Sequence, residues 1–292
     1  MLLFASSSFA AAPIKVMLLT GQSNPYHDWT KSSPLVKIYL EQTGLFAVEV
    51  VTAPAKDVEK SDFNPKFSDY AVVVMDYETM DWPEASKTAF VAYMKNGGGL
   101  VTIHAADNSF PNWAEFNEMI GVGGWGLTPT GGVNGRKSNV GLKVRWRDGK
   151  TVTEDTPGGY GHPAPQDFVL TARTPEHPVM KGLPNAFMHA KDEIYSNLRG
   201  PAMNVTVLAT AHADRPNAED EPMLMAISYG KGRVFHSTLG HVAPSQMPPF
   251  IPLTSVAFIV TLQRGTEWAA TGKVTQKVPA DFPTADKPSL RN

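Results

Sequence analysis

The chain has 292 residues, of which 42% are hydrophobic and 18% are charged, as expected of one large globular domain or two small ones. Its 26 basic and 28 acidic side chains leave a formal net charge of −2, which excludes the dense positive surface of proteins that bind nucleic acids or anionic membranes. The chain contains no cysteine, which excludes disulfides, thiolate metal ligands and every mechanism that needs a cysteine nucleophile.

The N-terminal residues 1–12 have the composition of the end of a secretory signal. A short apolar run is followed by small residues, and Ser8 and Ala10 offer a cleavage site for signal peptidase. We therefore expect a periplasmic or secreted protein. No stretch approaches about 18 uninterrupted apolar residues, so no membrane span is expected.

The first half of the chain alternates between strand and helix patterns. Short, β-branched, apolar runs predict buried strands at Ile14–Thr20, Phe46–Thr52, Tyr70–Met75 and Leu100–Ala105. Between them, apolar periodicity predicts helices over 30–43 and 82–96, the second capped by Asp81, and a third helix follows near 111–120. This alternation predicts an α/β fold with an open, mostly parallel sheet and helices on both faces.

The second half of the chain begins with a change in amino-acid composition. Residues 121–166 are rich in Gly, Pro and Asn and contain one predicted strand at Leu142–Trp146, which indicates a long, functional insertion. Further strands are predicted at Asp167–Ala172, Val205–Ala211, Met223–Tyr229 and Arg233–Leu239. A last helix over about 250–264 and an extended tail at 272–292 complete one domain that covers 13–271.

Polar residues follow several of the predicted strands. In an open parallel sheet, ligands bind beyond the carboxyl ends of the strands. Those ends here carry His27, Asp28 and Trp29; Asp76 and Glu78; His104, Asp107 and Asn108; and His241. A single histidine is more often structural, but three at the strand ends of one sheet favour a functional site.

His104 is the first candidate among these histidines. It closes the most apolar strand, with Gly97–Gly99 before that strand and Ala105 and Ala106 after it, so that a ligand can approach the backbone closely. Its imidazole can act as a general base, a general acid or a metal ligand.

A second cluster extends from His189 to Tyr195. If the segment is a strand, His189, Lys191 and Glu193 share one face, and if it is a helix, His189 and Glu193 lie one turn apart. Either geometry brings an imidazole and a carboxylate to one ligand, whereas the alternative is a solvated charged edge. His162 and His212 lie in predicted loops and are interpreted as surface residues.

Four tryptophans lie in or beside the predicted loops, and their flat faces suit stacking on the apolar face of a sugar. They are Trp29, Trp82, Trp113 and Trp125. The alternative is that they fill the core, which the helical pattern favours for Trp113.

At these residues the chain resembles the ThuA-like proteins of trehalose utilisation, members of the class I glutamine amidotransferase-like, flavodoxin-like superfamily. The matching stretches span about 14–270 and include Gly21–Trp29, Gly97–Ala106, Glu176–Pro184, Asp192–Tyr195 and Gly230–His241. The resemblance implies the fold of that superfamily and a substrate such as a disaccharide or its oxidised keto form. Amidotransferase relatives carry a cysteine in the turn that corresponds to Ile103–Ala105, so the missing cysteine excludes their thiol chemistry.

The residues and the resemblance together predict an exported enzyme that acts on a glycoside, disaccharide or keto-sugar by histidine and carboxylate acid–base chemistry. The predicted catalytic residues are His104, Glu193 and His241, and the predicted substrate-binding residues are His27, Asp28, Trp29, Asp107, Asn108, Asp192 and Tyr195. Metal assistance by one divalent ion of zinc, manganese or nickel is left open, with His27, His104, His189, Glu193 and His241 as candidate ligands.

The sequence leaves open whether the protein is catalytic and whether it forms oligomers. The alternative to an enzyme is a carbohydrate-binding or partner-binding protein on the same fold, without catalysis. The expected partner is a small-molecule carbohydrate, and a homo-oligomer is compatible with the sequence.

Overall fold

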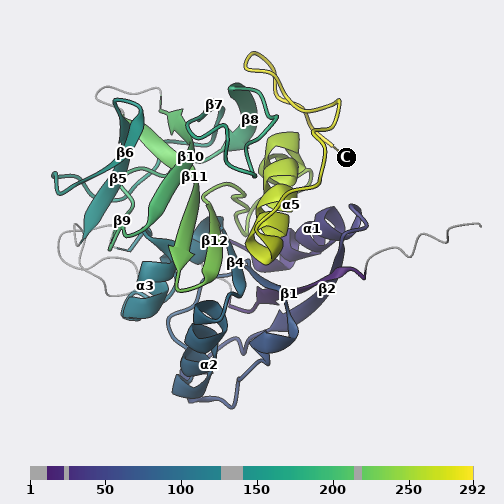
Figure 1. Cartoon of the computed structure of the whole chain (residues 1–292), viewed down its shortest axis with the longest axis vertical. Coiled ribbons are helices and arrows are strands. Elements are labelled where there is room, and N and C mark those ends of the chain that lie inside the picture. Colours follow the sequence, from purple (N-terminus) through teal and green to yellow (C-terminus); the bar gives the residue numbers. More distant parts are fainter. Residues whose placement is uncertain (1–11, 23–25, 126–140, 214–218, 292) are drawn as a thin grey trace, which may run out of the picture.

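The structure, a computed structural model, describes residues 12–22, 26–125, 141–213 and 219–291 (Figure 1). The expected signal remnant at 1–12 falls almost entirely outside these described residues. Within them, no helix combines the length and the apolar character that crossing a bilayer requires.

A nine-stranded sheet forms the middle of the molecule. Its strands, in spatial order, are β2 (Phe46–Thr52), β1 (Ile14–Thr20), β3 (Val72–Met75), β4 (Gly99–Ile103), β12 (Gly232–Ser237), β11 (Asp220–Tyr229), β10 (Val205–His212), β7 (Gln166–Ala172) and β8 (Ala186–Asp192). Each strand predicted in these regions is present, and β1 and β2 have the predicted bounds. The segment before Glu193, for which both strand and helix were considered, is the strand β8.

The expected mostly parallel sheet is wrong. The five strands from β2 to β12 run parallel, but each of the four pairs from β12 to β8 is antiparallel. One physical reason is the connection between β11 and β12, which consists only of Gly230 and Lys231. Such a turn joins antiparallel strands, whereas a parallel pair needs a long crossover connection. The fold is therefore a mixed α/β fold.

A second, three-stranded antiparallel sheet forms largely from the predicted insertion at 121–166. It contains β5 (Leu142–Arg147), which the sequence predicted, β6 (Lys150–Glu154) and the short β9 (Arg199–Gly200). Residues 126–140 of the insertion lie outside the described residues.

The first three helices begin and end close to the predicted positions, whereas the helix predicted over about 250–264 is interrupted at Ser255 and ends only at Thr271. The helices are α1 (Trp29–Glu41), α2 (Glu84–Lys95), α3 (Ala114–Ile120), the single turn α4 (Ile251–Thr254) and α5 (Val256–Thr271). Asp81 does not cap α2 as expected: the cap position is Pro83, and Asp81 accepts a hydrogen bond from the Trp82 amide instead.

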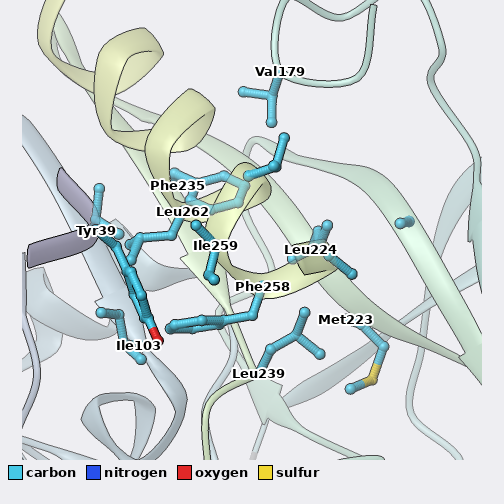
Figure 2. Close-up of a cluster of buried hydrophobic side chains, with 14 of the residues drawn as sticks. Tyr39, Ile103, Val179, Met223, Leu224, Phe235, Leu239, Phe258, Ile259 and Leu262 are labelled. Carbon is cyan, nitrogen blue, oxygen red and sulfur yellow. The ribbon is translucent and has the colours of Figure 1, made fainter. Parts of the chain in front are cut away.

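The core is divided by the main sheet into two clusters, because successive side chains of a strand point to opposite faces. Val16 and Leu18 of β1 pack with residues of α1 and α5, whereas Met17 and Leu19 pack with residues of α2 and α3. Figure 2 shows the first cluster, where side chains of α5, among them Phe258, gather with side chains from the sheet.

Three of the four tryptophans considered for sugar stacking belong to the second cluster. Trp82, Trp113 and Trp125 are 1%, 7% and 4% exposed, so they fill the core. Trp29, at the first position of α1, is only partly buried.

The C-terminal segment beyond α5 contains no helix or strand among its described residues and runs back along the molecule. The Met188 amide of β8 donates a hydrogen bond to the Thr284 carbonyl, and the rings of Phe187 and Phe282 lie 5.0 Å apart. Farther along the chain, Leu290 forms an isolated β-bridge with Ser255, the residue that separates α4 from α5. The segment therefore covers the outer edge of β8.

Candidate active site

The functional candidates gather at one end of the sheet, despite its mixed topology. His104 follows β4 and His241 follows β12 by a few residues, and these strands are parallel neighbours. The four antiparallel pairs that follow bring β8 back to the direction of β12. Glu193, directly after β8, therefore reaches the same end of the sheet as the two histidines.

His104 occupies a sharp turn, because it ends β4 and begins the short 3₁₀ helix His104–Asn108. Its φ of +45° is unusual for a residue other than glycine, and such strain is concentrated at functional sites. Its Nδ1 lies 2.8 Å from the Thr238 carbonyl oxygen. Because a carbonyl only accepts, Nδ1 carries the hydrogen, and Nε2 of the neutral ring presents a lone pair.

Three groups surround Nε2 of His104. The Tyr195 hydroxyl lies at 2.7 Å, Nδ1 of His241 at 3.0 Å and Oε2 of Glu193 at 3.6 Å. The same Glu193 oxygen lies 3.5 Å from Nδ1 of His241. The structure thus brings the three predicted catalytic residues together, with Tyr195 in contact.

The electrostatics of this group follow from its burial. Burial lowers the pKa of His104 well below its usual value, and His241 lowers it further. Burial also lowers the pKa of His241 to about 4 and raises the pKa of Glu193 to about 8, with the Asp192 charge adding to the latter shift. At neutral pH, without a bound cation, the site holds neutral imidazoles and a protonated carboxyl group.

Asp192 has a different environment from its neighbour. Its Oδ2 accepts from His189 Nε2 at 2.8 Å and from the Gly240 amide at 2.7 Å, and its Oδ1 accepts from the amides of Glu193 at 2.8 Å and His241 at 3.2 Å. Burial alone would raise its pKa, but the bonds from His189 and Gly240 and the nearby imidazoles lower it to about 2. With all these bonds made inside the protein, Asp192 positions Glu193 and His241.

His189 does not join the group around His104. Its Nδ1 is bonded to the Ser255 hydroxyl at 2.9 Å and its Nε2 to Asp192. The expected face shared by His189, Lys191 and Glu193 is wrong, because the sheet register shifts here and Lys191 has a φ of +47°. The regular alternation of β8 is therefore lost before Glu193.

His27 lies beside the group, with its ring centre 5.5 Å from that of His104. Its Nε2 is 3.2 Å from Oδ1 of Asp76, whose other oxygen accepts from the hydroxyls of Ser32 and Ser33. Asp76 thus fixes the orientation of the His27 ring, which lies beside His104 but is not one of the groups that surround its Nε2.

Three other predicted substrate-binding residues, Asp28, Asp107 and Asn108, lie in different structural settings. Asp28 caps α1 by accepting from the Thr30 amide. Asp107 is fully buried and lies 3.3 Å from Nε2 of His236, and Asn108 ends the 3₁₀ helix that His104 begins. Asp28 and Asp107 therefore have partners within the chain.

His162 is the site residue that sequence reasoning missed. Its Nδ1 lies 3.3 Å from Oε1 of Glu193, and its ring is 36% exposed. Two backbone hydrogen bonds between Gly161 and Ser196 bring this loop to the site. The only signal was the length of the insertion, since no local pattern predicts a pairing across 35 residues. His212, by contrast, is 60% exposed as expected and pairs with Asp220.

A family model and a solved structure assign the chain to one family. The family model ThuA, described as trehalose utilisation, matches residues 15–269. A ThuA-like protein of Parabacteroides merdae is 43% identical, with a TM-score of 0.87 over 96% of this chain and 98% of that one. No curated protein matched the chain.

Two more distant structures show the fold alone. A ThuA-like protein of Bacteroides uniformis is 19% identical, with a TM-score of 0.54 and coverage of 93% of this chain and 97% of that one. A cytoplasmic protein of Salmonella typhimurium is 14% identical, with a TM-score of 0.50 and coverage of 88% and 99%.

Proposed function

Because the chain belongs to the ThuA family of trehalose utilisation, we propose that it is an enzyme that processes a carbohydrate at His104, Glu193, His241 and Tyr195. The substrate class is a glycoside, a disaccharide or its keto form. The reaction is proton transfer by the imidazole and carboxyl groups of the site, with a metal-assisted version treated in the next subsection.

The observation that carries this proposal is the crowding of reactive groups around Nε2 of His104. A hydroxyl, a second imidazole and a carboxyl group all lie within 3.6 Å of this one atom. Buried polar groups that serve stability are normally arranged as satisfied donor and acceptor pairs. Several groups with strongly shifted pKa values at the end of a sheet are typical of a catalytic site.

The geometry supports a specific division of roles for a keto-sugar. Removal of a proton next to the carbonyl needs a base, and the carbonyl oxygen needs a proton or a hydrogen-bond donor. His104 takes the proton at Nε2, and the Thr238 carbonyl stabilises the resulting imidazolium through Nδ1–H. Glu193 in its protonated form donates to the substrate oxygen, and for a glycoside the same carboxyl would protonate the leaving oxygen.

The test is an assay of the purified chain with trehalose and with its keto form, with products identified by NMR. We expect turnover of one of the two, and a loss of about 10²–10⁴-fold in His104→Ala and Glu193→Gln. His212→Ala, which removes a surface histidine with its own carboxylate partner, should leave the rate unchanged. Saturable sugar binding without any product would instead favour the carbohydrate-binding protein.

We also propose that the protein is exported, on the basis of residues 1–12. A short apolar run and small residues at Ser8 and Ala10 support this. Fractionation and N-terminal sequencing of the protein from its native host should find it outside the cytoplasm and shortened near residue 10. A full-length protein in the cytoplasmic fraction would contradict the proposal.

A further inference from the structure

Three atoms of the site have separations that suit one metal ion. Nε2 of His104, Nδ1 of His241 and Oε2 of Glu193 are 3.0, 3.5 and 3.6 Å apart. A circle through three points so spaced has a radius of about 2.0 Å, so one ion can lie roughly 2.0–2.2 Å from all three, the usual bond length for zinc with nitrogen and oxygen. The three side chains therefore need only small adjustments to bind an ion together.

The ring of His104 is oriented for such a role. The bond from its Nδ1 to the Thr238 carbonyl fixes the hydrogen on Nδ1 and leaves the Nε2 lone pair facing the Tyr195 hydroxyl, His241 and Glu193. A metal-binding histidine commonly donates its other ring N–H to a backbone carbonyl or a carboxylate in this way. His27 and His189 fall outside the ligand set: the ligand atoms that lie within 4.8 Å of one another come from His104, Glu193 and His241, and both ring nitrogens of His189 contact Ser255 and Asp192.

The two other donors are oriented by residues that surround them. Asp192 accepts from the backbone amides of both Glu193 and His241, so one buried carboxylate fixes the positions of two donors. His162 lies 3.3 Å from Oε1 of Glu193, the oxygen that does not face the histidines. Because its Nδ1 lies 3.0 Å from the Pro163 carbonyl, Nδ1 carries the hydrogen, and this N–H group is also the one that faces Glu193.

We propose that His104, Glu193 and His241 bind one divalent transition-metal ion, and that His162 and Asp192 are positioning residues for this site. Three protein ligands leave coordination positions open for water or substrate, as in catalytic rather than structural metal sites. Two imidazoles and a carboxylate suit zinc, manganese, nickel or ferrous iron. The proposal deepens the proposed function and rests on the same side chains, but metal binding is measured without turnover.

The experiment is isothermal titration of the chelator-treated full chain with Zn²⁺, Mn²⁺ and Ni²⁺ separately. We expect at least one of them to bind with a stoichiometry of one, and His104→Ala and Glu193→Gln to abolish this binding. His162→Ala should weaken it by about 10–100-fold, the usual effect of losing an outer hydrogen bond. His162→Asn, which keeps an N–H donor near the same place, should restore most of the affinity.

His212→Ala is the matched control and should bind as the unchanged chain does. Circular dichroism of each variant without metal tests whether it is folded. The proposal fails if none of the three ions binds, or if a folded His104→Ala, Glu193→Gln double variant still binds one ion. Metal binding without any turnover would support this site and contradict the proposed enzyme. No metal binding together with full turnover in chelator would overturn the metal site and leave proton transfer by the residues alone.

Discussion

Asp192 and Glu193 are neighbours in the chain, but their carboxyl groups have opposite environments. Four donors surround the oxygens of Asp192, and its pKa falls to about 2. Burial raises the pKa of Glu193 to about 8, and its oxygens lie 3.3–3.6 Å from ring nitrogens of His104, His162 and His241. One carboxyl group is therefore fixed as an anion that supports the fold, and the other is left able to exchange a proton or bind a cation.

The largest expected effect comes from Asp192→Ala. This change leaves three backbone amides and His189 without their acceptor inside the protein. We expect the free energy of unfolding to fall by about 3–5 kcal/mol, and activity and metal binding to be lost with it. Urea unfolding measures the first effect. A loss below about 1 kcal/mol would mean that Asp192 does not support the fold as described.

Glu193→Gln should separate function from stability. The amide keeps the shape of the side chain and removes a carboxyl group whose charge is unfavourable when buried, so we expect the metal-free variant to be at least as stable as the unchanged chain. Turnover should fall by about 10²–10⁴-fold. Parallel urea unfolding and rate measurements check both, and equal losses in stability from Asp192→Ala and Glu193→Gln would remove the distinction between the two residues.

The pH dependence of unfolding should have opposite signs for the two carboxyl groups in metal-free protein. Folding lowers the pKa of Asp192 from 3.8 to about 2, so its contribution is present above the unfolded value and is lost as the pH falls. Folding raises the pKa of Glu193 from 4.5 to about 8, so its contribution is present at low pH and is lost as the pH rises through this range.

Unfolding curves between about pH 3 and pH 9 test this difference. Relative to the unchanged chain, Glu193→Gln should gain stability as the pH rises. The deficit of Asp192→Ala should shrink as the pH falls below about 4. Stability differences that stay constant with pH would contradict the assigned charge states.

The smallest expected effect comes from Ser255→Ala, at the far end of the hydrogen-bond chain through His189 to Asp192. The serine hydroxyl lies 2.9 Å from Nδ1 of His189. Its loss should cost about 0.5–1.5 kcal/mol of stability, measured by thermal unfolding, because one buried hydrogen bond is removed. Turnover should change by less than about threefold, since Asp192 keeps its backbone donors. A larger loss of turnover would extend the active site to this serine.

The strands and the central histidines could be predicted because their signals are local. The apolar run of β1 and the glycines before β4 fix those strands, and a residue that follows a parallel strand lies at a known end of the sheet. His104 and His241 therefore came together as expected. Glu193 lies beside both histidines, although the regular face that was expected to present it does not exist.

The remaining features depend on contacts between distant segments. The two-residue turn between β11 and β12 explains one antiparallel pair, but the strand patterns of β10 and β11 alone do not encode direction. The positive φ of Lys191 and the pairing of Gly161 with Ser196 appear only once β7 and the insertion are in place. For this reason Lys191 was placed on the wrong face and His162 was taken for a surface residue.

The strained turn at His104 places function and stability in opposition at one position. A residue other than glycine with a φ of +45° costs about 1–2 kcal/mol, which glycine would not incur. Glycine at position 104 would relieve this backbone strain, but it would also remove the buried imidazole and its hydrogen bonds to Thr238 and Tyr195. Laboratory evolution of this chain toward heat resistance would have to be coupled to a screen for activity, and a glycine variant supplied with free imidazole offers a direct way to recover the lost group.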